Sequence, residues 1–351
     1  MKKNLLVLGY FGYLNNQLDG QTIKTRNIYN LLKSKEEIID YEIEFFDTQI
    51  LRCRKINLLK MFFKIYNCKK LVYIPAHNNL QFFFPFFFII CKLKKIDIHY
   101  IVVGGWLSDF LKTRPLHKYF LSYIKGIYPQ TKILCEELKE KYNYNNVYQL
   151  INFRIHNFKS KSCEVEYEGI LRLVFLGRVQ KMKGVDVIFM LAQELKKQRI
   201  DNVYIDIYGP VSSDYKVEFN NHLQINKNVR YKGILEQKFI YEHLEKYHLM
   251  LFPTLYYTEG FPGSILDAYI AEVPVIVTKW KFANEFVDNN LSGIIVDFDN
   301  FNDFVYQIIT LVREPERINN LQKKLKIIKN KYSSESAWDL LKTKIFTVYF
   351  F

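Results

Sequence analysis

The sequence predicts an α/β protein built from two domains with parallel sheets. A chain of 351 residues is longer than one hydrophobic core ordinarily supports, so two domains of about 150 to 180 residues each are expected. Short β-rich apolar runs alternate with helical segments along the chain, a pattern typical of parallel sheets with crossover helices. Because 49% of the residues are hydrophobic, the composition excludes a disordered chain.

The first domain begins with an apolar run that predicts a buried strand at residues 4–9. Although the start, MKKNLLVLGYFGYL, imitates a signal peptide, Gly9 and Gly12 interrupt the apolar run and no small-residue cleavage site follows. Further strands are expected at residues 41–46, 69–74 and 98–103, with helices at 21–33 and 58–66 and a strand end and helix within 133–142. The polar, basic residues 154–169 predict the linker between domains.

The second domain shows the same alternation. Its strands are expected at residues 171–176, 203–208, 229–232, 249–253, 273–277 and 293–296. Helices are expected in between, among them residues 236–247, and then at residues 301–312, 315–331 and 334–349.

The net charge of +14 and the sequence pI near 9.2 indicate an anionic partner. Nucleic acid, a phosphate-bearing substrate and an acidic membrane surface all fit this charge. No helix-turn-helix, zinc-finger or RNA-binding signature occurs, so nucleic acid is not an expected partner.

The five cysteines are widely spaced and contain no C-x-x-C pair, which argues against a disulfide framework or a zinc site. They are Cys53, Cys68, Cys91, Cys135 and Cys163. A reducing, cytoplasmic location is expected.

Residues 80–91 contain the run FFFPFFFII. The run is about a dozen residues long, whereas a bilayer span needs roughly twenty. A buried or interfacial helix is therefore expected, with packing in the core favoured over insertion into a membrane. The adjoining KLKK could meet anionic lipid headgroups if the helix lies at an interface.

Residues 252–278 form the most informative stretch: a strand end, a glycine-rich loop, a short helix and a second strand. Ser264 is expected to cap this helix. The amides of Gly263, Ser264 and Ile265 would then point at an anion above the sheet.

Two carboxylates, Glu259 and Asp267, frame that loop and helix start. A carboxylate accepts two hydrogen bonds from neighbouring hydroxyls, as on a ribose or hexose. An acidic helix start favoured by the helix dipole is the alternative, and the pattern alone leaves both open.

The loop GRVQKMKG, residues 177–184, places Arg178 and Lys183 between a strand and a helix. A guanidinium and an ammonium group at this spacing suit a diphosphate, whose charge rises as its bond to a sugar breaks. Solvated loop charges are the alternative interpretation.

Three further strand ends carry candidate residues. The loop at residues 9–20, with Gly12 and Gly20, opens a helix that could hold phosphate or sugar, or could simply connect strand and helix. Gly209 follows a strand, where a glycine could serve only chain reversal. Asp109 follows Gly104-Gly105-Trp106, whose two glycines leave room for a ligand at a strand end. His99 and His117 are expected to be structural.

The segment from Glu259 to Asp267 resembles the E-x7-E signature of glycosyltransferase family 4, the retaining nucleotide-sugar enzymes of GT-B fold, with Asp267 in place of the second glutamate. The residues GR, Lys183 and Gly184 resemble the diphosphate motif of that family. The resemblance implies two Rossmann-like domains facing across a cleft. It assigns residues 1–160 to acceptor binding, 161–332 to nucleotide-sugar binding and 333–351 to a C-terminal helix that returns to the first domain.

The resemblance also implies roles for individual residues. The catalytic group would consist of Arg178, Lys183 and Glu259. The two cations would bind the diphosphate, and Glu259 would bind the transferred sugar. Asp109 and Gly12 would lie on the acceptor side, and no metal would be needed. The donor would be bound by Gly20, Gly209, Gly263, Ser264, Ile265 and Asp267.

The implied reaction is transfer, with retention, from a nucleotide diphosphate sugar, with UDP favoured, to a hydroxyl of a lipid-linked saccharide in capsule, O-antigen or exopolysaccharide synthesis. The protein would be cytoplasmic, with peripheral contact to an anionic membrane. A catalytically degenerate partner subunit is one alternative, motivated by Asp267 and by the absence of the histidine that the family often places near the sugar. A nucleotide-sugar epimerase, which shares the fold, is the other.

Overall fold

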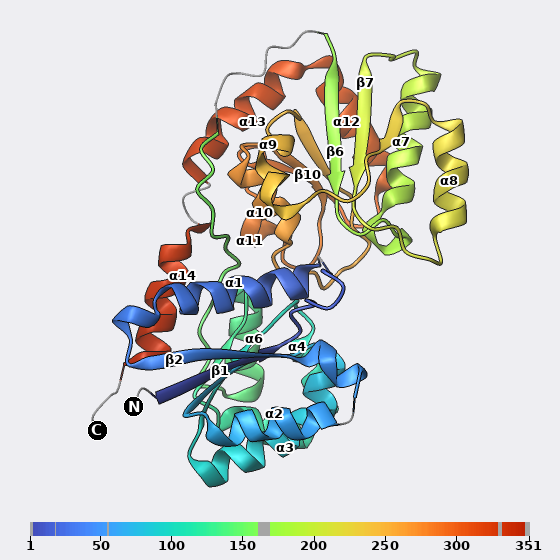
Figure 1. The fold of residues 1–351 in the computed structure, drawn as a ribbon. Helices are drawn as coiled ribbons and strands as arrows, with labels where there is room; N and C mark the ends of the chain where they lie inside the picture. The colour runs from blue at the N-terminus through green and yellow to red at the C-terminus, as the bar shows by residue number, and fades with distance from the viewer. Residues whose placement is uncertain (1–2, 18, 55, 161–168, 329–331, 348–351) are drawn as a thin grey trace. The chain divides into compact units, whose positions relative to one another are not determined.

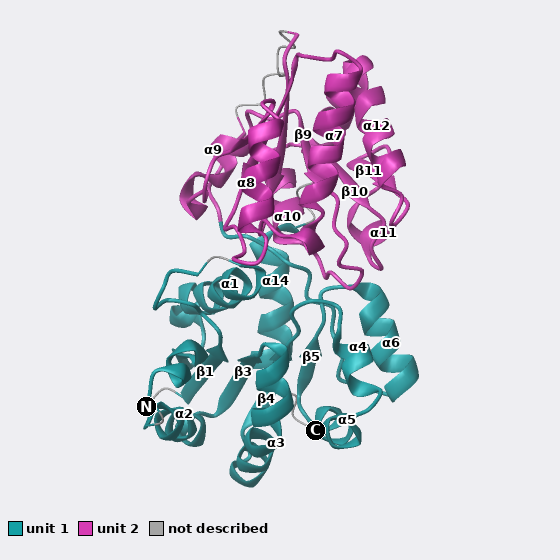
Figure 2. Ribbon diagram, turned by 90° about the vertical axis from the view of Figure 1, so that its right-hand side faces the viewer, with its two compact units in different colours: residues 1–155, 332–351 teal, residues 156–331 magenta. Residues whose placement is uncertain are grey.

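The computed structural model describes residues 3–17, 19–54, 56–160, 169–328 and 332–347. The chain forms two compact units, Met1–Ile155 with Tyr332–Phe351 and His156–Lys331 (Figure 2). Each unit is an α/β layer structure around one parallel sheet, as the sequence predicts. Residues 161–168 of the expected linker, with Cys163, lie outside the described residues.

Unit 1 contains a five-stranded parallel sheet in the order β2-β1-β3-β4-β5. Strand β1, which pairs with β2 and β3, carries the unbroken apolar run Leu5–Leu8 because helices cover both faces of the sheet. The prediction missed β5, since three residues carry too little periodicity to be recognised. The strands are β1 (Lys3–Gly9), β2 (Tyr41–Asp47), β3 (Lys70–Ile74), β4 (Asp97–Ile101) and β5 (Gly126–Tyr128).

Seven α-helices are described in unit 1. Figure 1 shows α1 and α14 along one face of the sheet, with α2 and α3 along the other. The strand end expected inside residues 133–142 is wrong, because α6 occupies the whole segment and Thr131 caps it. The helices are α1 (Gly20–Ser34), α2 (Ile56–Asn67), α3 (His77–Lys94), α4 (Leu107–Leu111), α5 (Pro115–Ser122), α6 (Lys132–Tyr142) and α14 (Ser334–Leu341).

Helix α3 contains the phenylalanine run for which a buried or interfacial helix was expected. One face, with Phe84, Phe87 and Phe88, is buried, while Phe82 and Phe86 on the opposite face are exposed. The helix therefore packs in the core on one side and presents apolar side chains on the other. Among the described residues, no helix combines the length and the apolar character that crossing a membrane requires.

Helix α14 is part of unit 1 although it follows unit 2 in the chain. Trp338 and Leu341 are buried in the same core as Ile28 and Leu32 of α1 and Val7 of β1. A single π-helical turn, Lys342–Phe346, extends α14 and adds Ile345 to this core. The last residues of the helix expected at 334–349 lie outside the described residues.

Unit 2 contains a six-stranded parallel sheet in the order β11-β10-β9-β6-β7-β8. All six strands were predicted, with differences of one or two residues at their ends. They are β6 (Leu171–Leu176), β7 (Val203–Tyr208), β8 (Val229–Tyr231), β9 (Leu249–Phe252), β10 (Val275–Thr278) and β11 (Gly293–Val296).

Two helices of unit 2, Lys216–Ile225 and Ala283–Phe286, were not predicted by residue range, and a third differs from its prediction. The helix expected at residues 236–247 is α-helical only at α9, because a 3-10 turn, Gln237–Phe239, precedes it. The helices are α7 (Val185–Lys197), α8 (Lys216–Ile225), α9 (Ile240–Leu244), α10 (Gly263–Ile270), α11 (Ala283–Phe286), α12 (Phe301–Arg313) and α13 (Pro315–Ile328).

Replacing Leu341 by alanine tests whether α14 stabilises unit 1. Leu341 is fully buried, so Leu341→Ala leaves a cavity and should lower the free energy of unfolding by about 2–5 kcal/mol. Denaturant unfolding followed by circular dichroism measures the change. Asp339→Ala, on the exposed face of α14, is the matched control and should change stability by less than about 0.5 kcal/mol. Equal effects of the two substitutions would contradict the packing.

Candidate functional site

The site in unit 2 begins with two neighbouring strands. Because β6 and β9 pair in parallel, the loops that follow them leave the same edge of the sheet. The backbone N–H of Leu255 in the second loop donates a hydrogen bond of 3.0 Å to the carbonyl oxygen of Met182 in the first. The two loops that carry the predicted site residues are thus joined directly.

Gly184 allows this close approach. Its φ of 72° lies in the left-handed region, and a Cβ there would lie 1.7 Å from the carbonyl oxygen of Pro253. Only glycine fits both the conformation and the space. The second glycine of the GRVQKMKG loop is therefore a packing requirement that positions Lys183 beside the β9 loop.

Lys183 and Glu259 form an ion pair across the two loops, with Nζ donating to Oε1. Their side chains are 17% and 16% exposed, and Lys183 Nζ lies 5.8 Å from the centre of the Phe252 ring. The structure thus brings together two residues that are 76 positions apart in the sequence. Each remains partly accessible, which a ligand contact requires.

Arg178 differs from Lys183 in its surroundings. It is exposed, and no ion-pair partner of its guanidinium occurs among the described residues. The neighbouring Val179 anchors the loop, because its N–H donates to Pro210 O at 2.9 Å and its carbonyl accepts from Ser212 N–H at 3.0 Å. Arg178 therefore extends into solvent from an anchored loop.

Helix α10 begins at the carboxyl edge of the same sheet. Its N-cap is Pro262, which has no side-chain cap hydrogen bond, so the expected cap by Ser264 is wrong. Ser264 lies instead inside the first turn, between Gly263 and Ile265. The amides of these three residues are the first-turn groups that an α-helix leaves without an intrahelical partner. They remain suited to an anion.

Asp267 lies further along α10 and is buried, with 4% of its surface exposed. Glu259 lies in the loop before the helix and is only partly buried. The two carboxylates that looked equivalent in the sequence therefore have different environments. Hydrogen bonding of Asp267 to a ligand hydroxyl stays a prediction.

Gly209 is explained by backbone packing at the ends of β6 and β7. Its φ is 136°, and a Cβ would lie 1.8 Å from the carbonyl oxygen of Gly177. Its N–H donates to Gly233 O at 2.9 Å. Gly209 thus lies against the residue that precedes Arg178, and its contact with a nucleotide stays a prediction.

The loop that carries Gly12 in unit 1 is held from two sides. Asp47 accepts hydrogen bonds from the N–H groups of Phe11 and Tyr13, at 3.0 and 3.1 Å. Arg26 donates to the carbonyl oxygens of Phe11 and Gly12, at 2.8 and 3.1 Å. Arg26 therefore holds the backbone of this loop in place.

Helix α1 begins next to this loop. Asp19 and Thr22 form a capping box, and Gly20 is the first helical residue, with open space where a Cβ would lie. The sequence predicted a helix start here, and the structure adds that the side chain of Asp19 accepts a hydrogen bond from the N–H of Thr22. Gly12 and Gly20 as ligand contacts stay predictions.

Asp109 lies on the exposed part of α4 and pairs with Lys112, whose Nζ is 2.7 Å away. An exposed pair of this kind contributes little to stability. His99 is buried beside Tyr128 OH, 2.9 Å from its Nδ1, and burial lowers its pKa to about 3. A buried neutral histidine within the sheet agrees with the structural role expected for it.

Lys24 is the polar residue in unit 1 that the sequence gave no reason to single out. It is 2% exposed, and its Nζ donates to Val102 O at 3.2 Å, just beyond the carboxyl end of β4. Burial lowers its pKa from 10.5 to about 7. The polar neighbours Thr22, Thr25 and Asn27 of α1 are buried as well, so the polarity of a residue in this helix does not reveal its burial.

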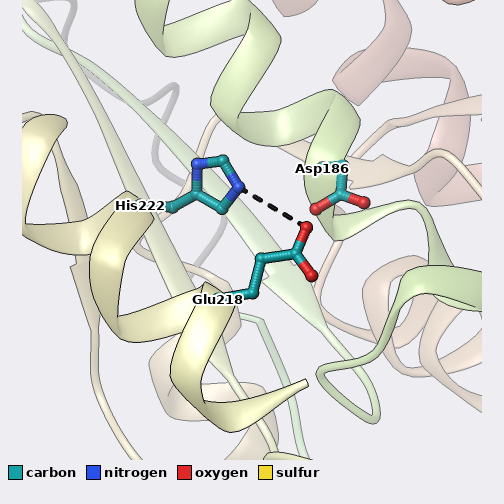
Figure 3. Close-up of side chains that lie close together, drawn as sticks. All are labelled: Asp186, Glu218 and His222. Atoms are coloured by element: carbon teal, nitrogen blue, oxygen red, sulfur yellow. Dashed lines mark ion pairs between the residues drawn. The ribbon is translucent and has the colours of Figure 1, made fainter. Parts of the chain in front are cut away.

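Three metal-ligand side chains of unit 2, Asp186, Glu218 and His222, gather at α7 and α8 (Figure 3). Protein groups already engage them. Lys181 Nζ lies 2.8 Å from Glu218, the Tyr215 hydroxyl donates to Asp186, and His222 Nε2 is 4.0 Å from Glu218. These contacts account for the cluster as a surface network of ion pairs and hydrogen bonds.

Substitution of Lys24 tests the consequence of its burial. Between pH 7 and about 10 the unfolded chain binds a proton that the folded chain does not, so stability should rise with pH over this range. Lys24→Met removes the penalty and should raise the free energy of unfolding near pH 7 by up to about 4 kcal/mol. Urea unfolding at several pH values measures this, with the exposed Lys139→Met as control. An unchanged pH slope in Lys24→Met would refute the assignment.

Gly184→Ala tests the contact between the two loops. Gly233 is a matched control, because its φ is also positive, at 79°, but no atom lies within 4 Å of its Cβ position. Both substitutions should cost about 1–2 kcal/mol in backbone strain, and Gly184→Ala should cost several kcal/mol more because the loops must separate. Thermal unfolding of both variants provides the comparison. Similar losses would show that the loops part easily.

The sequence has known relatives. Residues 159–331 match the family described as glycosyl transferases group 1. The capsular polysaccharide biosynthesis glycosyltransferase CapM of Staphylococcus aureus is 24% identical over 285 residues, which cover 68% of this chain and 72% of that protein. The poly(ribitol-phosphate) alpha-N-acetylglucosaminyltransferase of Staphylococcus aureus (strain COL) is 24% identical over 61% of this chain, but the match spans only 42% of that protein.

Solved structures show the same fold. Anabaena Alr3699/HepE, crystallised with UDP-glucose, superposes with a TM-score of 0.76 at 11% identity, over 97% of this chain and 99% of that one. The pneumococcal O-GlcNAc transferase GtfA, in complex with UDP and GlcNAc, superposes with a TM-score of 0.66 at 14% identity, over 82% of this chain and 59% of that one. These structures confirm the predicted GT-B fold. The match to the family model and to the sequence relatives shows that the chain is a glycosyltransferase.

Proposed function

We propose that this protein is a retaining glycosyltransferase of family 4, which moves a sugar from a nucleotide diphosphate sugar, with UDP favoured, to a hydroxyl of a lipid-linked saccharide. The observation that carries the proposal is the contact between Lys183 and Glu259, since it unites the diphosphate loop and the sugar-side carboxylate at one sheet edge. Similarity to a capsular polysaccharide enzyme and to structures solved with UDP supports the choice of donor and pathway class.

The partly buried ion pair suits donor binding. A diphosphate arriving at the loop would take hydrogen bonds from Lys183 and from the exposed Arg178, while the first-turn amides of α10 add neutral donors. Glu259 would then exchange part of its contact with Lys183 for hydroxyl groups of the sugar. The charges are held in place by the anchored loops before the donor arrives.

The proposed chemistry follows from this placement. As the glycosidic bond breaks, negative charge grows on the leaving diphosphate, and the two cations stabilise it where it develops. The acceptor hydroxyl oxygen forms its new bond to the anomeric carbon on the face from which the diphosphate leaves, which gives retention. The proton of that hydroxyl passes to the leaving phosphate. We propose that no metal takes part, because Arg178 and Lys183 supply the positive charge, and that the reaction takes place in the cytoplasm.

Calorimetric titration of UDP into single variants tests the donor site. Lys183→Met should weaken UDP binding by about 10- to 100-fold, as the loss of a charged hydrogen bond predicts. Lys181→Met is a control in the same loop, because Lys181 pairs with Glu218 and not with Glu259. This control should bind UDP within about threefold of the original protein.

The same titrations distinguish the alternatives. If the intact protein binds none of UDP, GDP and ADP, the site assignment fails and the degenerate partner subunit is favoured. If a bound nucleotide sugar is converted to an altered free one without an acceptor, the chain acts as an epimerase. Unchanged turnover in the presence of EDTA is expected, and its loss would contradict the metal-free reaction.

A further inference from the structure

Two helices of unit 1 expose apolar side chains in regular stripes. On α2 the exposed residues are Ile56, Leu59, Phe63 and Tyr66, and on α3 they are Phe82, Phe86, Ile89 and Leu93. Each set follows the three- and four-residue spacing of a helix face. Their exposed fractions lie between 51% and 79%, so these side chains are not covered within the chain.

These stripes lie on neighbouring helices. Phe62 of α2 contacts Phe87 of α3, with ring centres 5.6 Å apart, and Phe88 of α3 stacks on Phe120 of α5 at 4.3 Å. The inner faces of α2 and α3 pack on the sheet, on the side opposite α1 (Figure 1). The stripes therefore point away from the sheet, and α5 extends the surface with exposed Leu116, Tyr119 and Tyr123.

The charge of this surface is predominantly positive, although Glu44 of β2 pairs with Lys64 of α2 at its edge. Between Thr48 and Ile96 the sequence contains ten lysines and arginines and no aspartate or glutamate, and α5 contains no acidic residue either. Lys94 Nζ lies 3.7 Å from the centre of the Tyr66 ring, and Lys92 Nζ lies 5.2 Å from that of Tyr123. Cations and exposed rings are thus interleaved, the composition that membrane interfaces favour.

A cavity of ≈ 600 Å³ opens beside α2. Leu5 and Leu6 of β1 line it together with the exposed Leu59 and Phe63, and Lys60 lies at the same place. Apolar side chains contribute most of the exposed lining, so the cavity continues the exposed stripe of α2 into the protein. Polar residues also line it, namely Asn4, Glu44, Lys64 and Asn67. An apolar chain that enters here would leave its headgroup near a lysine.

We propose that the surface formed by α2, α3 and α5 docks this protein onto a bilayer of anionic phospholipids. The lysines contact the phosphate headgroups, and the exposed phenylalanines and leucines enter the acyl boundary. A second copy of the chain is a poor occupant, because self-association through this surface would bring like charges together. Only the biological purpose of this docking rests on the proposed function, because a protein bound at the membrane would meet a lipid-linked acceptor there.

Vesicle flotation of the full chain tests the docking. The protein should float with phosphatidylglycerol vesicles and remain unbound with phosphatidylcholine vesicles. Lys92→Gln with Lys94→Gln should lower the partition coefficient by roughly 30-fold at low salt, at about 1 kcal/mol per cation. Lys216→Gln with Lys227→Gln, two exposed lysines of unit 2, remove the same charge and should change partitioning by less than about threefold.

A second pair of variants tests the apolar stripe. Phe82→Ser with Phe86→Ser should abolish binding to anionic vesicles, whereas Val217→Ser with Ile225→Ser, exposed on α8, should leave it intact. UDP titration of every variant is run in parallel. Intact UDP binding without vesicle binding by the original protein would overturn the docking alone, and vesicle binding without UDP binding would overturn only the proposed function.

One outcome would assign the surface to a different partner. If the original protein ignores anionic vesicles and sediments as a dimer, while Phe82→Ser with Phe86→Ser sediments as a monomer, the surface is an interface between copies and the proposal is wrong. A monomer that floats with anionic vesicles and releases at high salt supports it.

Discussion

The close backbone contact between the loops after β6 and β9 is the constraint on which the candidate site depends. Two adjacent parallel strands end at the same edge, and Gly184 lets its loop touch Pro253. Only then can Lys183 reach Glu259 from a position 76 residues away. The charged pair is therefore a consequence of strand order and of one missing side chain.

The two units use the carboxyl edges of their sheets differently. In unit 2 that edge carries charged side chains that remain partly accessible, Lys183 and Glu259. In unit 1 the loop after β1 is fixed by Arg26 and Asp47, and Lys24 is buried under the end of β4. Burial of a lysine costs free energy, so unit 1 carries a polar group at this edge that packing alone does not require.

Some features of the site could be read from local sequence and others could not. The EGFPGSILD and GRVQKMKG segments indicated two loops that the structure joins, because glycines, cations and carboxylates there are close in sequence. The predicted cap of α10 by Ser264 was wrong, because Pro262 occupies the N-cap position. A serine near a helix start is only a weak indication of a cap. The burial of Lys24 could not be predicted, since burial is a property of the whole packed unit and not of the neighbouring residues.

The sequence by itself determined the α/β class, the positions of most strands along the chain and the chemical character of the loops, because hydrophobic periodicity and turn residues are local signals. Only the tertiary structure decided which charges meet, which glycines are obligatory and which face of α3 is covered. These depend on contacts between residues far apart in the chain, as with Lys183 and Glu259 or Gly209 and Gly177. The helical spacing of the phenylalanines was present in the sequence, but the sheet decided which half is buried.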